Sequence, residues 1–127
     1  MKLLLDTHAL LWFVAGDRRL SRSARRRLEE PNAELFFSTA SVWEMAIKAS
    51  RGRLTLPASV EAYIGERIAM GLRPLPVTWS HASRVEQLPF HHDDPFDRLL
   101  VAQALVERLP LVTRDRIFRT YGVEVVW

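Results

Sequence analysis

The strongest constraint on the fold is a run of three leucines at residues 3–5, which Asp6 ends at once. The run is too short and too close to the N-terminus for a long helix, so it predicts a short strand buried on both faces. Such strands belong to parallel sheets that are covered by helices on either side. Asp6 would then lie at the carboxyl edge of a central strand, where open α/β sheets bind ligands. Taken alone, Asp6 is better explained as the N-cap of a helix that begins near His8, and the functional interpretation depends on the other acids.

Length and composition favour one ordinary globular domain spanning residues 1–127. The chain is 48% hydrophobic and 26% charged, and its lack of cysteine excludes disulfides and thiolate metal sites. Asp6 interrupts the first apolar run, and no apolar stretch approaches the roughly 20 residues of a membrane span. We therefore expect a cytoplasmic protein without a signal peptide. The net charge of +3 mildly favours an anionic partner such as nucleic acid.

Strand and helix patterns alternate along the whole chain. Short apolar runs predict five strands, at residues 2–5, 34–38, 72–77, 111–113 and 123–126. Helical patterns lie between them, at residues 8–15, 21–29, 39–50, 60–70, 79–88, 95–106 and in a short segment after residue 115. The third helix is expected to be capped by Thr39 or Ser41, and the two prolines of the third strand predict an edge position or a short ladder. This alternation predicts a three-layer α/β fold.

Four acidic residues are expected at one edge of this sheet. Asp6 and Asp115 each follow a strand, whereas Glu44 and Asp97 are expected in the first turns of helices. Right-handed βαβ connections bring the carboxyl ends of strands and the starts of the following helices to the same edge. The four carboxylates should therefore gather there.

Each acid also has a purely structural explanation. Glu44 has capping-box spacing from Ser41 and salt-bridge spacing to Lys48. A charge at Asp97 suits the helix dipole, and Asp115 suits a cap. Asp94 suits the N-cap position because proline follows it at the first helical position.

The four acids as a set favour a bound cation, because gathered carboxylates repel one another unless they are neutralised. A site made only of oxygen ligands favours Mg²⁺ or Mn²⁺ over zinc. Such ions lower the pKa of bound water and stabilise charge in phosphodiester displacement.

The acidic segments resemble, in order, those of PIN-domain ribonucleases, and in particular the VapC-like toxins of type II toxin–antitoxin systems. The matching segments are residues 3–8 (LLLDTH), 41–44 (SVWE), 94–104 (DPFDRLLVAQA) and 111–115 (LVTRD). Each segment alone is weak evidence for the family, but the ordered set is strong evidence and spans essentially the whole chain.

The resemblance implies a five-stranded parallel sheet flanked by helices. It also implies a Mg²⁺-dependent endoribonuclease that hydrolyses RNA by metal-activated water and binds a cognate antitoxin; Mn²⁺ is an expected substitute. Asp6, Glu44 and Asp97 match the three firmest acids of the family, and Asp115 matches a more variable fourth. All four are the expected catalytic and metal-binding residues. Thr7 and Thr113 match hydroxyl positions near the site, and Asp94 matches an outer-shell feature of a subgroup.

Two other functional classes stay open from the sequence. One is a non-catalytic RNA-binding module on the same fold, and the other is a DNA nuclease or phosphatase on a similar sheet. The apolar segment 10–14 is expected to leave a surface patch for the antitoxin or for a second copy in a homodimer.

Three further features have competing explanations. His91 and His92 beside Asp93 fit either a transition-metal site or, better, a polar loop before a capped helix. The four tryptophans fit the core or an interface better than base stacking. The arginines at residues 22–27 fit a phosphate-binding face, a solvated helix face or an antitoxin contact.

Overall fold

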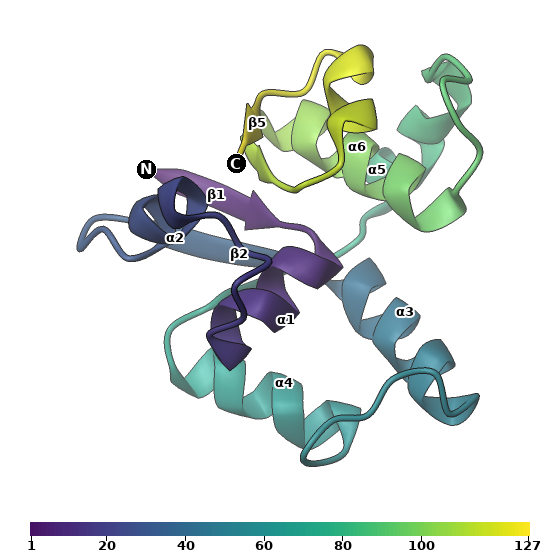
Figure 1. Ribbon diagram of the computed structural model, residues 1–127. Coiled ribbons are helices and arrows are strands. Elements are labelled where there is room, and N and C mark those ends of the chain that lie inside the picture. Colours follow the sequence, from purple (N-terminus) through teal and green to yellow (C-terminus); the bar gives the residue numbers. More distant parts are fainter.

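A five-stranded parallel sheet organises the protein, and the computed structural model describes all 127 residues (Figure 1). The strand order is β3-β2-β1-β4-β5, so the leucine strand is central, as the sequence predicts. The strands are β1 (Lys2–Leu5), β2 (Glu34–Ser38), β3 (Arg73–Leu75), β4 (Leu111–Val112) and β5 (Val125–Val126). The last three are shorter than predicted, and the two outer positions belong to β3 and β5. The edge position of the proline-containing strand is thereby confirmed.

Helices fill every connection between these strands. They are α1 (Thr7–Ala15), α2 (Arg22–Leu28), α3 (Thr39–Ser50), α4 (Val60–Ala69), α5 (Trp79–Arg84), α6 (Pro95–Glu107) and the 3₁₀ helices η1 (Val85–Gln87) and η2 (Arg116–Tyr121). The predicted helix over residues 79–88 is thus divided between α5 and η1. None of these helices combines the length and the apolar character needed to cross a membrane.

Alternate side chains of β1 belong to two separate cores. Leu3 and Leu5 pack with residues of α1, α2, α3 and α4, whereas Leu4 packs with residues of α6 and η2. Successive side chains of a strand point to opposite faces, so one three-leucine strand contributes to both cores. All three leucines are at most 1% exposed. The helices consequently form a layer on each face of the sheet, which confirms the predicted three-layer α/β fold (Figure 1).

The parallel arrangement places several chain reversals at one edge of the sheet. β1 is paired in parallel with β2 and with β4, and each of these three strands leads into a helix. The helices that follow are α1, α3 and η2, capped by Asp6, Ser38 and Asp115 respectively. The polar residues that follow the three central strands therefore lie at the same edge of the sheet, the edge of the carboxyl ends.

Candidate functional site

Five carboxylates line a single cavity of about 200 Å³ at the carboxyl edge of the sheet. They belong to Asp6, Glu44, Asp94, Asp97 and Asp115. The four acids that the sequence predicts at one edge are therefore brought together, along with Asp94. Their roles in catalysis and metal binding stay predictions.

Asp6 ends β1 and caps α1. Its carboxylate accepts a hydrogen bond from the amide of Ala9 at 2.7 Å, so the capping explanation holds alongside the cavity position. Burial raises the pKa of Asp6, and the negative charge of Glu44 raises it further, against hydrogen bonds from Thr113 and Ala9. A buried carboxyl with an acidic neighbour is a group that a cation would stabilise.

Glu44 is oriented by two side chains. The Thr7 hydroxyl donates to Oε1 at 2.7 Å, and the Lys48 ammonium donates to Oε2 at 2.8 Å. The predicted salt bridge is confirmed, whereas the predicted capping box is wrong because Ser38 caps α3. Glu44 consequently lies in the second turn of α3 and not in the first, and still lines the cavity.

Asp97 lies in the first turn of α6, as predicted. Asp94 caps this helix by accepting a hydrogen bond from the Asp97 amide at 2.9 Å. Burial raises the pKa of Asp97 to about 6, and the charges of Asp94 and Asp6 add to the rise, while His92 opposes it. The favourable helix dipole is thus outweighed by burial and by neighbouring acids.

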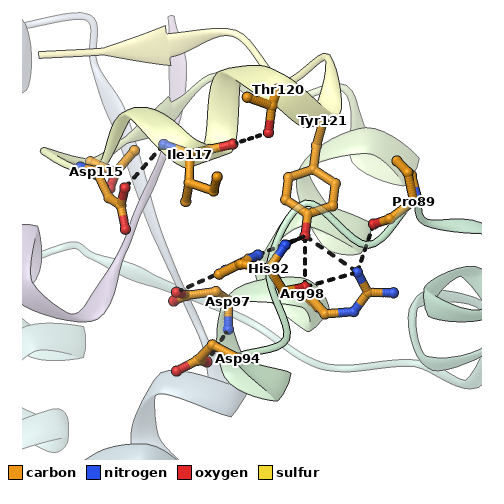
Figure 2. A network of polar contacts seen from close by, with 10 residues as sticks. Pro89, His92, Asp94, Asp97, Arg98, Asp115, Ile117, Thr120 and Tyr121 are labelled. Atoms are coloured by element: carbon orange, nitrogen blue, oxygen red, sulfur yellow. Dashed lines mark hydrogen bonds and ion pairs between the residues drawn. The ribbon is translucent and has the colours of Figure 1, made fainter.

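A polar network holds the second oxygen of Asp97 (Figure 2). Nε2 of His92 lies 3.2 Å from Oδ2 of Asp97, and Nδ1 of His92 lies 2.6 Å from the Tyr121 hydroxyl. Arg98, 5% exposed, reaches the same hydroxyl at 3.3 Å and donates to the Pro89 carbonyl at 2.7 Å. His92, which lies in the loop before α6, therefore contacts both Tyr121 of η2 and Asp97 of the acidic cavity.

The sequence did not reveal this linkage, although the histidine pair beside Asp93 marked the segment. His92 contacts Asp97 and Tyr121, while His91 packs edge-on against the Tyr121 ring. Carboxylates that bind metals are themselves usually hydrogen-bonded, so a histidine five residues before Asp97 was the available signal.

Asp115 lines the cavity from the end of β4, whereas Glu44 reaches it from the helix after β2, on the other side of the central strand β1. It caps η2 by accepting from the Ile117 amide at 3.0 Å, as predicted. The Asp115 amide in turn donates to the Thr113 hydroxyl at 3.1 Å. Figure 2 shows the carboxylates of Asp97 and Asp115 directed to the same side of the network.

The donor set fits a divalent cation. The five acids supply only carboxylate oxygens, which Mg²⁺ and Mn²⁺ prefer. Burial and neighbouring negative charge disfavour ionisation of Asp6 and Asp97, and a cation would offset both effects. No group of three or more histidine, aspartate or glutamate side chains is arranged to hold one ion directly. Mg²⁺ suits this spacing because it keeps several waters and takes one or two carboxylates directly.

A larger groove adjoins the acidic cavity. It has a volume of about 640 Å³ and lies between α1, α3, α4 and the extended segment 53–57. Thr7, His8 and Lys48 line both spaces. Apolar side chains line the groove together with the cations Arg19, Lys48, Arg53 and Arg67. We call this space the apolar groove.

The predicted patch at residues 10–14 is only partly exposed. Leu10 is fully buried in the core, so the prediction is wrong for that residue. Leu11, Trp12 and Val14 line the apolar groove.

The tryptophans divide between two environments. Trp12 and Trp127 are partly buried and pack edge-on at 6.1 Å, as the core prediction requires. Trp43 and Trp79 are 62% and 85% exposed, so a core position is wrong for both.

Comparison with known proteins supports the family resemblance that the sequence motifs indicated. Residues 3–124 match the family model for the PIN domain. The chain is 34% identical over 119 residues to Ribonuclease VapC22 of Mycobacterium tuberculosis, covering 93% of this chain and 90% of that protein.

Solved structures share the fold at lower identity. A chain of VapBC2 from Rickettsia felis, bound to a promoter DNA fragment, has a TM-score of 0.73 and 15% identity, with 98% of this chain and 97% of that chain covered. A chain of DNA-bound VapBC from Salmonella typhimurium also has a TM-score of 0.73, at 18% identity and 98% and 96% coverage. These two likenesses concern the fold.

Proposed function

Because the chain belongs to the PIN-domain family, we propose that it is a Mg²⁺-dependent endoribonuclease acting as the toxin of a type II toxin–antitoxin pair. The observation that carries the proposal is the convergence of five carboxylates on one cavity at the carboxyl edge of the sheet. The 34% identity to a VapC ribonuclease over most of both chains supports RNA as the substrate. A module that only bound RNA would gain nothing from carboxylates gathered opposite a polyanion.

Asp6, Glu44 and Asp97 would hold one or two ions, partly through direct carboxylate ligands and partly through bound waters, with Asp115 assisting and Asp94 acting from outside. When bound, Mg²⁺ lowers the pKa of water and stabilises negative charge on the phosphate undergoing hydrolysis. The protein contributes orientation, because Thr7 and Lys48 fix the two oxygens of Glu44. His92 likewise holds Asp97. We expect cleavage to leave 3′-hydroxyl and 5′-phosphate ends.

The test is expression of the protein alone in a bacterial host, with growth and RNA integrity as readouts. The parent should arrest growth, and Asp6→Asn, Glu44→Gln or Asp97→Asn should relieve the arrest. Each change removes a charge with little change in volume. Asp93→Asn is the matched control, since Asp93 is exposed and outside the cavity. Soluble variants that all stay as toxic as the parent would refute the catalytic assignment.

The partner is an antitoxin that occupies the apolar groove and reaches the acidic cavity with a basic side chain. The groove adjoins that cavity, because Thr7, His8 and Lys48 line both, so one bound segment can cover both spaces. Solved relatives of the same fold are VapBC assemblies.

A co-purification assay with the product of a neighbouring small gene tests the partner. Leu54→Arg, which places a charge in the groove, should weaken the complex and restore nuclease activity in its presence. Ile68→Arg is the control, because Ile68 is exposed on α4 outside the groove. Association that leaves nuclease activity unchanged would contradict the proposal.

A further inference from the structure

A large aromatic side chain stands in solvent beside the acidic cavity. Trp43 on α3 is 62% exposed, and its ring packs against Phe96 with centroids 5.3 Å apart and planes at 64°. Phe96 itself lines the acidic cavity. We call Trp43 and Phe96 the aromatic step.

Each residue of the aromatic step is the sequence neighbour of a carboxylate that lines the cavity. Trp43 directly precedes Glu44 on α3, and Phe96 directly precedes Asp97 on α6. Phe96 lines the acidic cavity directly, and Trp43 lies next to the cavity through its contact with Phe96. Two helices thus place an aromatic residue and an acid side by side, and the two aromatic rings meet.

The geometry leaves the indole ready to bind another ring. The edge-on contact with Phe96 covers only part of the indole, and 62% of Trp43 stays exposed to solvent. Phe96 is the only ring paired with Trp43, and no guanidinium lies over it. Trp12, by contrast, is engaged by His8, Trp127, Arg19 and Arg114. The Trp43 side chain therefore has one aromatic contact, with Phe96, and most of its surface is accessible to a further ring.

We propose that Trp43, held by Phe96, stacks on a nucleobase of single-stranded RNA next to the phosphate at the acidic cavity. This inference rests on the proposed function and adds the residue that holds a base beside the cleaved bond. Carboxylates repel the phosphates of RNA, so the nucleotides beside the cleaved bond need contacts that do not depend on charge. Stacking on an aromatic ring provides such a contact and tolerates any base, because every base has a π-face. A base can stack this way only where it is free of a duplex, which favours loops and unpaired segments.

The first test compares a normal RNA with a strand that has no bases. Binding to a labelled single-stranded RNA of about eight nucleotides is measured by fluorescence anisotropy in EDTA, so that metal-dependent cleavage is prevented. Trp43→Ala should weaken binding about tenfold, whereas Trp43→Tyr should stay within about threefold of the parent. On a ribose-phosphate strand of equal length without bases, Trp43→Ala should bind as the parent does. Trp79→Ala is the control, because Trp79 is 85% exposed and outside the cavity.

Two outcomes would overturn the inference. One is a Trp43→Ala protein that binds the normal RNA as well as the parent does. The other is an equal loss of affinity for both strands, together with a change from dimer to monomer in light scattering. That result would assign the aromatic step to an interface between two copies of the chain.

A cleavage assay of the parent with Mn²⁺ separates this inference from the proposed function. If the parent cleaves no RNA while binding to bases still depends on Trp43, the proposed function fails and the stacking contact stands. If the parent cleaves RNA and Trp43→Ala cleaves it with unchanged kcat and KM, only the stacking contact fails.

Discussion

Replacing Asp97 by Asn should stabilise the metal-free protein at neutral pH. The carboxyl lies in the first turn of α6, where a negative charge ordinarily stabilises a helix by about 0.3–1 kcal/mol. Burial and the charges of Asp94 and Asp6 nevertheless raise the pKa of Asp97 from 3.8 to about 6. The folded protein therefore disfavours the ionised form, and Asn at this position resembles the neutral form.

The magnitude follows from the pKa. A rise of this size corresponds to roughly 3 kcal/mol, since a tenfold change in an acid constant is about 1.4 kcal/mol. The Asp97 side chain is 35% exposed, so solvent screening reduces the effect by about half or more. We expect Asp97→Asn to be about 1 kcal/mol more stable, which raises Tm by roughly 3–5 °C in a domain of this size.

The pH dependence gives a second readout. The unfolded carboxyl ionises near its ordinary pKa of 3.8, whereas the folded carboxyl ionises at a pKa of about 6. The parent therefore loses stability as pH rises from about 4 to about 6, and the loss is constant above that range. The advantage of Asp97→Asn should be greatest at pH 7 or above, shrink between pH 6 and 4, and vanish below about pH 4.

Thermal melting in EDTA across this pH range is the assay, with Asp93→Asn as the matched control. An imidazole ordinarily titrates in the same range, so the comparison is repeated in a His92→Gln background. There the advantage of Asp97→Asn should persist, because the contact that opposes the raised pKa is gone. If Asp97→Asn is instead about 0.3–1 kcal/mol less stable than the parent at neutral pH, with the difference vanishing only below about pH 4, the charge of the carboxyl acts on the helix dipole alone and the acids do not repel one another.

Three further predictions concern the metal, a buried arginine and a helix cap. Mn²⁺ at tenfold excess over its Kd should stabilise the parent by roughly 1.4 kcal/mol in thermal melting. Asp97→Asn should lose most of this response and Asp93→Asn should keep it; equal responses would argue against the site. Arg98→Ala should destabilise by about 3 kcal/mol in urea unfolding, because the Leu88 and Pro89 carbonyls lose their buried donor. A loss below about 1 kcal/mol would show that water replaces the guanidinium. Ser38→Ala should destabilise by about 1 kcal/mol through loss of the α3 cap, and Ser41→Ala by less; the reverse order would contradict the observed start of α3.

The fold was largely predictable because its determinants are local. An apolar run ended by a polar residue is enough to indicate a buried strand, as at residues 3–5. Proline after Asp94 marks the start of α6, and Gly16 marks the end of α1 because its φ of 66° suits glycine. The alternation of such signals determines the α/β class.

The predicted cap of α3 was wrong because several neighbouring residues can each cap a helix. Ser38, Thr39 and Ser41 can each cap a helix, and the sequence does not rank them. The structure uses the Ser38 hydroxyl for the Ala40 amide and the Thr39 hydroxyl for the Val77 amide on another segment. Because Thr39 is engaged by a residue far along the chain, only the tertiary structure decides where α3 begins.

The membership of the acidic site was predictable, whereas its surroundings were not. Parallel strands bring their carboxyl ends to one edge whatever the side-chain packing, so Asp6, Glu44, Asp97 and Asp115 could be grouped from sequence alone. Contacts between segments far apart in the chain, such as His92 with Tyr121, have no local signal. The exposure of Trp43 also could not be predicted, because the sequence of α3 does not reveal which helix face is exposed or that Trp43 contacts Phe96. The sequence by itself determined the elements and their order; packing between distant segments decided how each carboxylate is held and which aromatic ring stays open beside them.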